Sequence, residues 1–158
     1  LNLNNSKWIK AIDKCIESGV LFVIDYGYAS QEYFLHDRSD GTLVCIHKHK
    51  SNFDPLSNIG NQDISSFVNF SHLKNLSLNT DLTVSGFLSQ SSFLINLNIL
   101  DIHKLKDYGD DEALIESNKL KNILLPNTMG ELFKVLVMQK NIEIELKSTR
   151  EFNQMHKL

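Results

Sequence analysis

The segment Asp25-Tyr26-Gly27-Tyr28 is the part of the sequence best suited to chemistry, and it directly follows the apolar run at residues 20–24. This β-branched and aromatic run predicts an interior strand of a parallel sheet with helices on both faces. Open α/β sheets bind their ligands outside the carboxyl ends of such strands. Asp25 is therefore a candidate for binding a cationic or hydroxylated ligand, with the tyrosines as a wall. An Asp that caps a turn with its own backbone explains the residue equally well.

Histidines and cysteines offer weaker candidates. His47 and His49 would share one face of a strand and could contribute to a metal site. Two lysines flank them and no third ligand is close in sequence, so a solvated basic segment is favoured and no metal is predicted. Cys15 lies on the apolar stripe of a predicted helix and Cys45 within a predicted strand, so both are expected in the core. Two cysteines exclude a disulfide framework, as is typical of a reducing compartment.

Helices and strands must position these groups. Apolar periodicity and capping residues predict helices at about residues 6–16, from Asp63 or Ser65 through Phe70, from Ser89 through Leu97, and from the acidic cluster at 107–112 to about Leu125. Strands are predicted at residues 20–24, 41–46, 82–87 and 133–138, and the alternation at 142–146 predicts another, half-exposed strand. The polar residues 149–158 are expected to form a frayed tail.

Composition narrows the class of protein. The 158 residues are 42% hydrophobic and 22% charged with a formal net charge of −3, which is typical of one soluble globular domain. The sequence has no basic surplus for binding nucleic acid or a membrane surface, and its longest apolar run is far too short to cross a bilayer. The seven glycines are never closer than eight positions apart. A Rossmann-type or phosphate-loop enzyme complete in itself is therefore excluded.

Several short segments occur in a characteristic order. They are residues 19–28 (GVLFVIDYGY), Gly41-Thr42-Leu43, His49, Pro55-Leu56, Gly60, Asp63-Ile64, Val68, Phe70, Gln90, Phe93-Leu94 and residues 129–136 (MGELFKVL). This series resembles the C-terminal half of the MidA (DUF185-type) family of S-adenosylmethionine-dependent methyltransferases, from about Lys7 to about Lys140. Each segment alone is a weak signal, whereas the combination is specific.

The resemblance implies an α/β fold: part of the Rossmann-like sheet of a class I methyltransferase, with an antiparallel pair among its C-terminal strands and with helical insertions. Residues 20–25, 82–87 and 133–138 would be its fifth, sixth and seventh strands. Residues 1–148 would form the C-terminal part of the methyltransferase domain, followed by the tail at 149–158. The loop that binds S-adenosylmethionine would precede Leu1, so no cofactor-binding residue is assigned here and the fragment alone is expected to be inactive.

The resemblance also implies a function. Mitochondrial relatives methylate arginine in a subunit of respiratory complex I during its assembly. The expected methyl acceptor is therefore a protein arginine, and the expected location is the bacterial cytoplasm or the mitochondrial matrix. The candidate catalytic residues are Asp25, Tyr26 and Tyr28, and the candidate substrate-binding residues are Asp63, Phe70 and Gln90.

Two positions depart from the family pattern. Relatives commonly carry a His where this chain has Phe67 and an Asp where it has Asn69. These changes leave open an alternative, a non-catalytic interaction or respiratory-complex assembly module derived from the same family. Without the earlier strands, the strand at residues 20–24 would keep an unpaired apolar edge, so we expect it to pair with the missing N-terminal half or with a second copy. Neither nucleic acid nor membrane is an expected partner.

Overall fold

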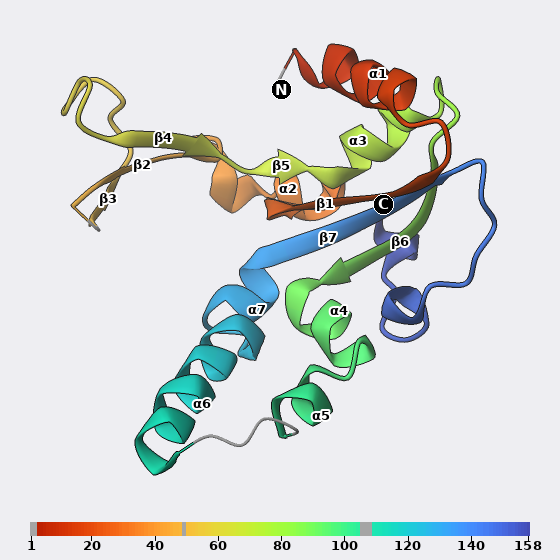
Figure 1. Cartoon of the computed structure of the whole chain (residues 1–158). Coiled ribbons are helices and arrows are strands. Elements are labelled where there is room, and N and C mark those ends of the chain that lie inside the picture. The colour runs from red at the N-terminus through yellow and green to blue at the C-terminus, as the bar shows by residue number, and fades with distance from the viewer. Residues whose placement is uncertain (1–2, 49, 105–108) are drawn as a thin grey trace.

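A four-stranded mixed sheet forms the centre of the fold (Figure 1). The computed structural model describes residues 3–48, 50–104 and 109–158. The strand order is β5-β1-β7-β6. β1 (Gly19–Tyr28) is antiparallel to β7 (Phe133–Lys140), β7 is antiparallel to β6 (Thr83–Ser89), and β5 (Val68–Asn69) runs parallel to the end of β1. The predicted α/β class with an antiparallel pair is confirmed.

β1 is longer and less enclosed than the sequence predicts. It extends to Tyr28 because β7 pairs with it from Gly19 to Tyr26 and β5 pairs with its last two residues. A Cβ atom at Gly27 would overlap the carbonyl oxygen of Val68, so the close approach of β5 requires glycine there. The prediction of an interior parallel strand is wrong for most of β1. Its main partner is antiparallel, and among the described residues no strand pairs with its other edge before Gly27.

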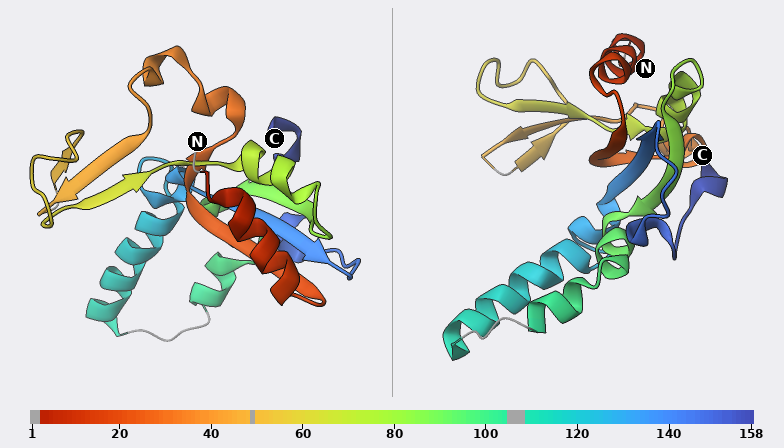
Figure 2. Two further views of the ribbon diagram at one scale, coloured as in Figure 1. Left: turned by 90° about the horizontal axis from the view of Figure 1, so that it is seen from above. Right: turned by 45° about the vertical axis from the view of Figure 1, so that its right-hand side comes forward.

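Helices lie on both faces of this sheet (Figures 1 and 2). None of those in the described part of the chain has the length and apolar character needed to cross a membrane. One face carries α1 (Asn5–Cys15) and α3 (Phe70–Ser77), and the other carries α4 (Gln90–Asn96) and α7 (Met129–Leu132), from which α5 (Ile99–Lys104) and α6 (Asp110–Leu124) extend away.

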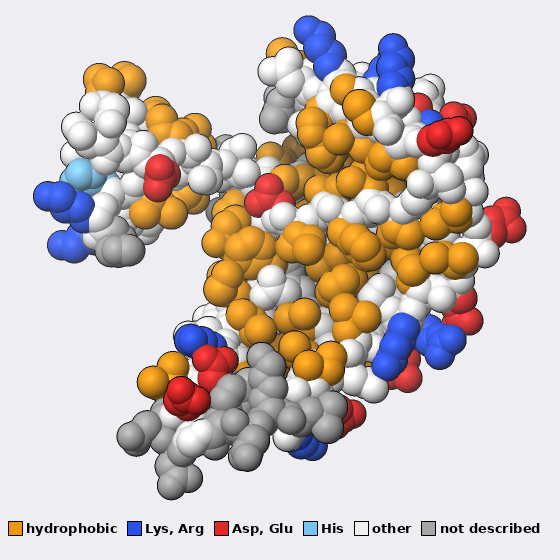
Figure 3. Space-filling view, viewed as in Figure 1, with side chains coloured by type: hydrophobic (Ala, Val, Ile, Leu, Met, Phe, Trp, Pro, Cys, Tyr) orange, Lys and Arg blue, Asp and Glu red, His pale blue; other side chains and the backbone are white. Residues whose placement is uncertain are grey.

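The second face is incompletely covered where β1 runs along it. Phe22 contacts Phe93 of α4, with 5.6 Å between ring centroids. Even so, Phe22, Ile24 and Tyr26 are 43%, 51% and 39% exposed. Figure 3 shows hydrophobic surface across the middle of the molecule, between α1 above and α4 below. β1 therefore combines an open hydrogen-bonding edge with an exposed apolar face.

A second, three-stranded antiparallel sheet projects from the first, and we call it the arm (Figures 1 and 2). In it β2 (Leu43–His47) lies between β3 (Lys50–Asn52) and β4 (Asp63–Ser66). α2 (Ser30–Tyr33) and the 3-10 helix η1 (His36–Arg38) connect β1 to the arm. The prediction of a helix that begins at Asp63 or Ser65 is wrong, because those residues pair with β2. The helix begins at Phe70, after the capping residue Asn69.

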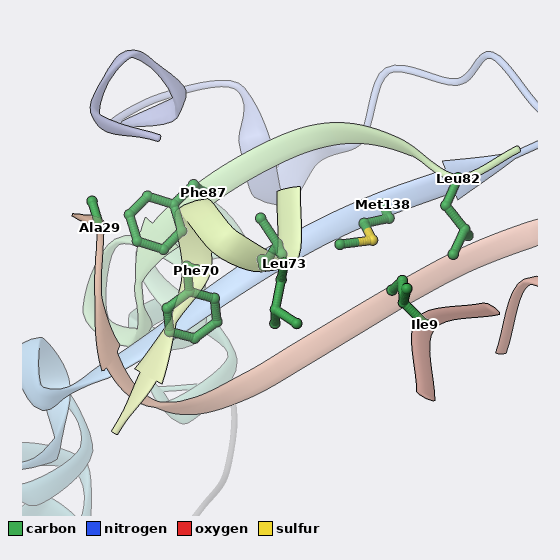
Figure 4. Packing of buried hydrophobic residues seen from close by; sticks show 8 residues of the cluster. Ile9, Ala29, Phe70, Leu73, Leu82, Phe87 and Met138 are labelled. Atoms are coloured by element: carbon green, nitrogen blue, oxygen red, sulfur yellow. The ribbon is translucent and has the colours of Figure 1, made fainter. Parts of the chain in front are cut away.

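The hydrophobic core lies between the sheet and the helices α1 and α3 (Figure 4). Leu21 and Val23 of β1 pack against this core. Cys45 is buried as expected, but Cys15 is exposed, because the buried face of α1 follows Ile9 and leaves Cys15 at its flank. The buried cluster comprises Ile9, Ala29, Phe70, Leu73, Leu82, Phe87, Leu136 and Met138.

The C-terminal segment covers the outer edge of β6. The backbone N–H of Gln154 donates to the carbonyl of Phe87 at 2.7 Å, and the N–H of Phe87 donates to Oδ1 of Asn153 at 3.0 Å. Met155 and Leu158 pack against the core, so the expected fraying of this tail is not observed. Residues 142–146 form no strand either. The side-chain amide of Gln139 instead binds both the N–H and the carbonyl of Ile144.

A half-buried ionic cluster attaches α1 to the end of β7. Nζ of Lys140 lies 2.8 Å from Oδ1 of Asp13 and 3.4 Å from Oδ2 of Asp81. The hydrogen bond from Lys140 lowers the pKa of Asp13, and the same bond raises the pKa of Lys140. The stabilisation is therefore complete between about pH 4 and pH 10, the ordinary pKa values of Asp and Lys in unfolded chains. It is lost as the pH falls toward the folded-state pKa of Asp13, or rises toward that of Lys140.

Asp13→Asn is expected to lower the thermal unfolding midpoint at pH 7, because it leaves the buried Lys140 ammonium without its principal partner. The difference from the wild-type protein should shrink as the pH is lowered below 4, where Asp13 becomes protonated in both states. Thermal unfolding followed by circular dichroism from pH 3 to pH 8 measures this. Asp101→Asn is the control, since its pair with Lys104 is exposed. Equal shifts for the two variants would contradict the assignment.

Candidate functional site

A cavity of about 940 Å³ opens where β1 ends and the arm begins. Its walls come from β1, the segment of α2 and η1, the start of β2, the residues joining β4 to α3, and the first turns of α1 and α3. Ligands of α/β sheets bind at this end of a strand. The lining side chains with the greatest capacity to bind a ligand are Asp25, His36, Arg38, Thr42, Asn69 and His72.

Asp25 lines the cavity with one carboxylate oxygen available. Oδ1 accepts a hydrogen bond from the N–H of Tyr26 at 2.7 Å, which is the local backbone contact considered as an alternative for this residue. Lys134, directly across on β7, does not neutralise it, because that ammonium lies 2.5 Å from Oε1 of Glu131. Within the described part of the chain Oδ2 has no hydrogen-bond partner. Asp25 therefore combines a structural contact with a free acceptor.

Tyr26 and Tyr28 do not form a wall beside Asp25. Side chains alternate between the faces of a strand, so both tyrosines lie on the face opposite to Asp25. Phe67, which lines the cavity, connects them: its ring centroid lies 6.2 Å from that of Tyr26 and 5.5 Å from that of Tyr28. Tyr26 also packs on Phe133 of β7, at 4.0 Å between centroids. Both tyrosines thus pack against Phe67 and do not contact the cavity themselves.

Asn69 holds the cavity wall together at the start of α3. Its Oδ1 accepts hydrogen bonds from the hydroxyl of Ser30 at 3.1 Å and from the N–H of His72 at 3.0 Å. An amide oxygen serves both acceptor roles, so the carboxylate that the family pattern leads us to expect at this position is not required for the cap. The departure at position 69 therefore leaves the local structure intact.

The structure does not bring the substrate-binding candidates together. Asp63 is exposed on β4 in the arm, and Gln90 uses its amide to bind the carbonyl of Ile123 at 3.0 Å, which ties α4 to α6. Phe70 is fully buried in the core, so its side chain packs against the protein and is not available to a substrate. Phe70 is a candidate only through the family resemblance, and the structure gives its side chain a packing role in the core.

Of the two histidines considered for a metal site, only His47 is described by the structure. Nδ1 of His47 lies 2.5 Å from the carbonyl oxygen of Asn61, and His49 is outside the described residues. Across the ranges that the structure describes, no group of three or more His, Cys, Asp or Glu could hold a metal ion. Part of the acidic cluster, at positions 107–108, also lies outside those ranges, and α6 begins within the cluster at Asp110.

Arg38 was not identified by its sequence context. The centre of its guanidinium lies 4.0 Å from the ring centroid of Tyr28, and Nη1 donates to the backbone carbonyl of Glu32. The side chain is half-buried and lines the cavity. The sequence offers one feature that could have drawn attention to Arg38, namely that it is one of two arginines in the sequence. Its contact with Tyr28 depends on the path of the loop between them.

The chain is similar to one protein family and to two proteins of known structure. Residues 1–88 match the family described as "Putative S-adenosyl-L-methionine-dependent methyltransferase". Two crystal structures of COG1565 superfamily proteins from Burkholderia thailandensis are each 30% identical to the chain with a TM-score of 0.91. One is an uncharacterised protein in its native form, and the other was solved bound to S-adenosyl-homocysteine.

The chain spans about two-fifths of the length of these structures, since the alignments cover 97% of the chain but 41% and 40% of theirs. No functionally curated protein matches the sequence.

Proposed function

Because the chain belongs to this family of S-adenosyl-L-methionine-dependent methyltransferases, we propose that the intact protein transfers a methyl group to an arginine of a protein substrate. In this proposal the described residues form the acceptor side of the active site. The observation that carries it is the cavity at the end of β1, which presents the free carboxylate oxygen of Asp25. A structural relative binds S-adenosyl-homocysteine, the product that such a transfer leaves.

Methyl transfer requires that the acceptor be positioned and that water be kept away from the reacting atoms. The cofactor supplies an electrophilic methyl group, and the acceptor nitrogen must approach it in line with the bond that breaks. In such a transfer the arginine nitrogen would form a bond to the methyl carbon while the methyl–sulfur bond breaks with its electron pair on sulfur, and the proton that the nitrogen loses would pass to water. Asp25 would bind the planar guanidinium through a charge-assisted hydrogen bond and orient it. Phe67 would form an apolar part of the wall of the same cavity.

The cofactor loop is proposed to lie outside these residues, on a part of the protein that packs beside β1. The edge of β1 supports this. The edge of β6 is covered by the C-terminal segment, whereas β1 offers an open edge and an exposed apolar face to a further strand. Natural sheets rarely leave such an edge bare. We propose that the remainder of the protein pairs along it, and that the chain in isolation pairs with a second copy instead.

Isothermal titration calorimetry with S-adenosylmethionine tests the proposed activity. The full-length protein should bind the cofactor, and the 158-residue chain alone should bind it weakly or not at all. Absence of binding by the full-length protein would contradict the methyltransferase assignment. It would leave the alternative of an assembly module, which a partner pulldown without the cofactor-binding part would support.

Asp25→Asn is expected to lower kcat/KM for methylation of an arginine peptide by about 10- to 100-fold. A hydrogen bond to a charged group contributes about 1.5–3 kcal/mol, and every 1.4 kcal/mol corresponds to a factor of ten. Radiolabelled methyl transfer by the full-length protein measures the effect. Asp63→Asn is the matched control, because that carboxylate is exposed on β4 and away from the cavity. Equal activity of the Asp25 variant and the wild-type protein would rule out this role.

A further inference from the structure

The cavity holds a second charged group whose chemistry is opposite to that of Asp25. Arg38 is fixed by two contacts, the ring of Tyr28 beneath its guanidinium and the carbonyl of Glu32 at Nη1. Arginine held in this way loses little further conformational freedom when it binds a ligand. Its planar group has five N–H donors, and only one of these bonds is formed within the described residues.

Arg38 has no carboxylate partner in the described part of the chain. The ion pairs there join Lys or Arg to acids elsewhere, and none includes Arg38. The carboxylate of Glu32, whose backbone Arg38 contacts, pairs instead with Lys157 at 3.8 Å. Asp25 is the one acid among the described residues that line the cavity, against Arg38 and the two histidines His36 and His72. A fixed, half-buried guanidinium without a counterion is a site for an anion.

We propose that Arg38 binds a carboxylate of the methyl acceptor, so that the site selects arginines with an acidic residue nearby. This inference rests on the proposed function and deepens it. Asp25 binds the guanidinium of the substrate, and Arg38 binds a carboxylate on the same chain. Guanidinium and carboxylate pair in a planar, two-bond geometry that a carboxamide cannot reproduce. Arg38 is thus a specificity-determining residue, and two contacts of opposite charge fix the orientation of the acceptor.

The test compares pairs of peptides whose termini are blocked. Each peptide contains one arginine, and the two members of a pair differ only in carrying Glu or Gln at one position, which lies one or two residues before or after that arginine. Binding to the full-length protein is measured by titration in the presence of S-adenosyl-homocysteine. For at least one position the Glu peptide should bind about tenfold or more tightly than its Gln counterpart. Arg38→Met should abolish that difference, and Arg38→Lys should reduce it. Arg150→Gln is the control, since Arg150 pairs with Glu145 on the surface, and it should leave the difference unchanged.

Two results would overturn the proposal. One is the absence of any Glu preference in the wild-type protein, including the absence of binding. The other is a preference that persists in Arg38→Met. Should that variant fail to fold, the Arg38→Lys variant and a decline of the Glu preference with added salt carry the test.

The carboxylate could also belong to the amino-acid part of the cofactor. Affinity for S-adenosyl-homocysteine should therefore be the same in Arg38→Met and the wild-type protein, and a selective loss would overturn the assignment to the acceptor. Failure of the proposed function is a separate outcome. If the peptides bind with an Arg38-dependent Glu preference but are not methylated, the anion site stands and the arginine methyltransferase activity does not.

Discussion

Replacement of Phe70 by alanine is expected to lower the free energy of unfolding by about 3–5 kcal/mol. The ring is fully buried between α3 and the sheet, with its centroid 5.3 Å from that of Phe87. The substitution removes these contacts and leaves a cavity that the surrounding side chains fill only in part. Single domains are stable by only about 5–15 kcal/mol, so the loss is a large fraction of the total. For a chain of this size the thermal midpoint should fall by roughly 6–20 °C.

Phe53→Ala is the matched control, because that ring is 77% exposed in the arm and its loss should change the unfolding free energy by less than about 0.5 kcal/mol. The comparison also separates the two roles considered for Phe70. A core residue changes stability, whereas a substrate-binding residue changes peptide affinity at constant stability. A Phe70→Ala protein with an unchanged midpoint and weakened peptide binding would restore the role that the family resemblance suggested.

Apolar periodicity and capping residues correctly predict those helices and strands that pack against segments near in sequence or that are strongly apolar. The helix that became α1, the strand β7 and the helix ending before Pro126 were all found in this way. The errors lie where distant segments decide the structure. Residues 63–66 resemble a helix start because they contain Asp and Ser, the residue types that cap helices. They form β4 because β2, some twenty residues earlier, offers a hydrogen-bonding edge. The C-terminal tail is ordered by side-chain bonds from Asn153 to β6, which polarity alone does not indicate.

The candidate site shows the same division. Asp25 was singled out because the end of an apolar strand is visible in one sequence, and the structure places it in a cavity. The prediction that the tyrosines form a wall beside Asp25 is wrong because β1 continues through Tyr28. In a continuous strand, alternate residues lie on opposite faces. Arg38 depends on a loop that folds back over Tyr28, a contact across ten residues with no periodic signal. The hydrophobic pattern of the sequence therefore indicates where the site lies. Which charged side chains line it depends on the conformation of the segment after β1, which the pattern does not predict.

The 158-residue chain in isolation is expected to self-associate through the open edge of β1. Unpaired N–H and C=O groups along the first eight residues of this strand, beside the exposed side chains of Phe22 and Ile24, favour pairing with another strand. Introducing charge on such a face is a device by which natural proteins prevent this pairing. The double substitution Phe22→Lys and Ile24→Lys should therefore convert a dimer or larger species into a monomer, as measured by sedimentation velocity.

Ile59→Lys serves as the control for this effect. Ile59 is 74% exposed in the loop of the arm, and it is another apolar side chain through which copies could associate. If Ile59→Lys disperses the chain while the β1 variant does not, association occurs through the arm and not through β1. If the unmodified chain is a stable monomer, the open edge is tolerated and the proposed pairing is wrong.

In the full-length protein one of these two substitutions, Ile24→Lys, should be unfavourable. If the remainder of the protein pairs along β1 and covers Ile24, then Ile24→Lys places an ammonium in an apolar interface, where a charge without a partner is strongly destabilising. The thermal midpoint and the affinity for S-adenosylmethionine should both fall. Conversion of the isolated chain to a monomer by charges at Phe22 and Ile24, together with a loss of stability of the full-length protein caused by Ile24→Lys, is explained if β1 faces another part of the same protein. An unchanged midpoint of the full-length variant would show that Ile24 remains exposed there.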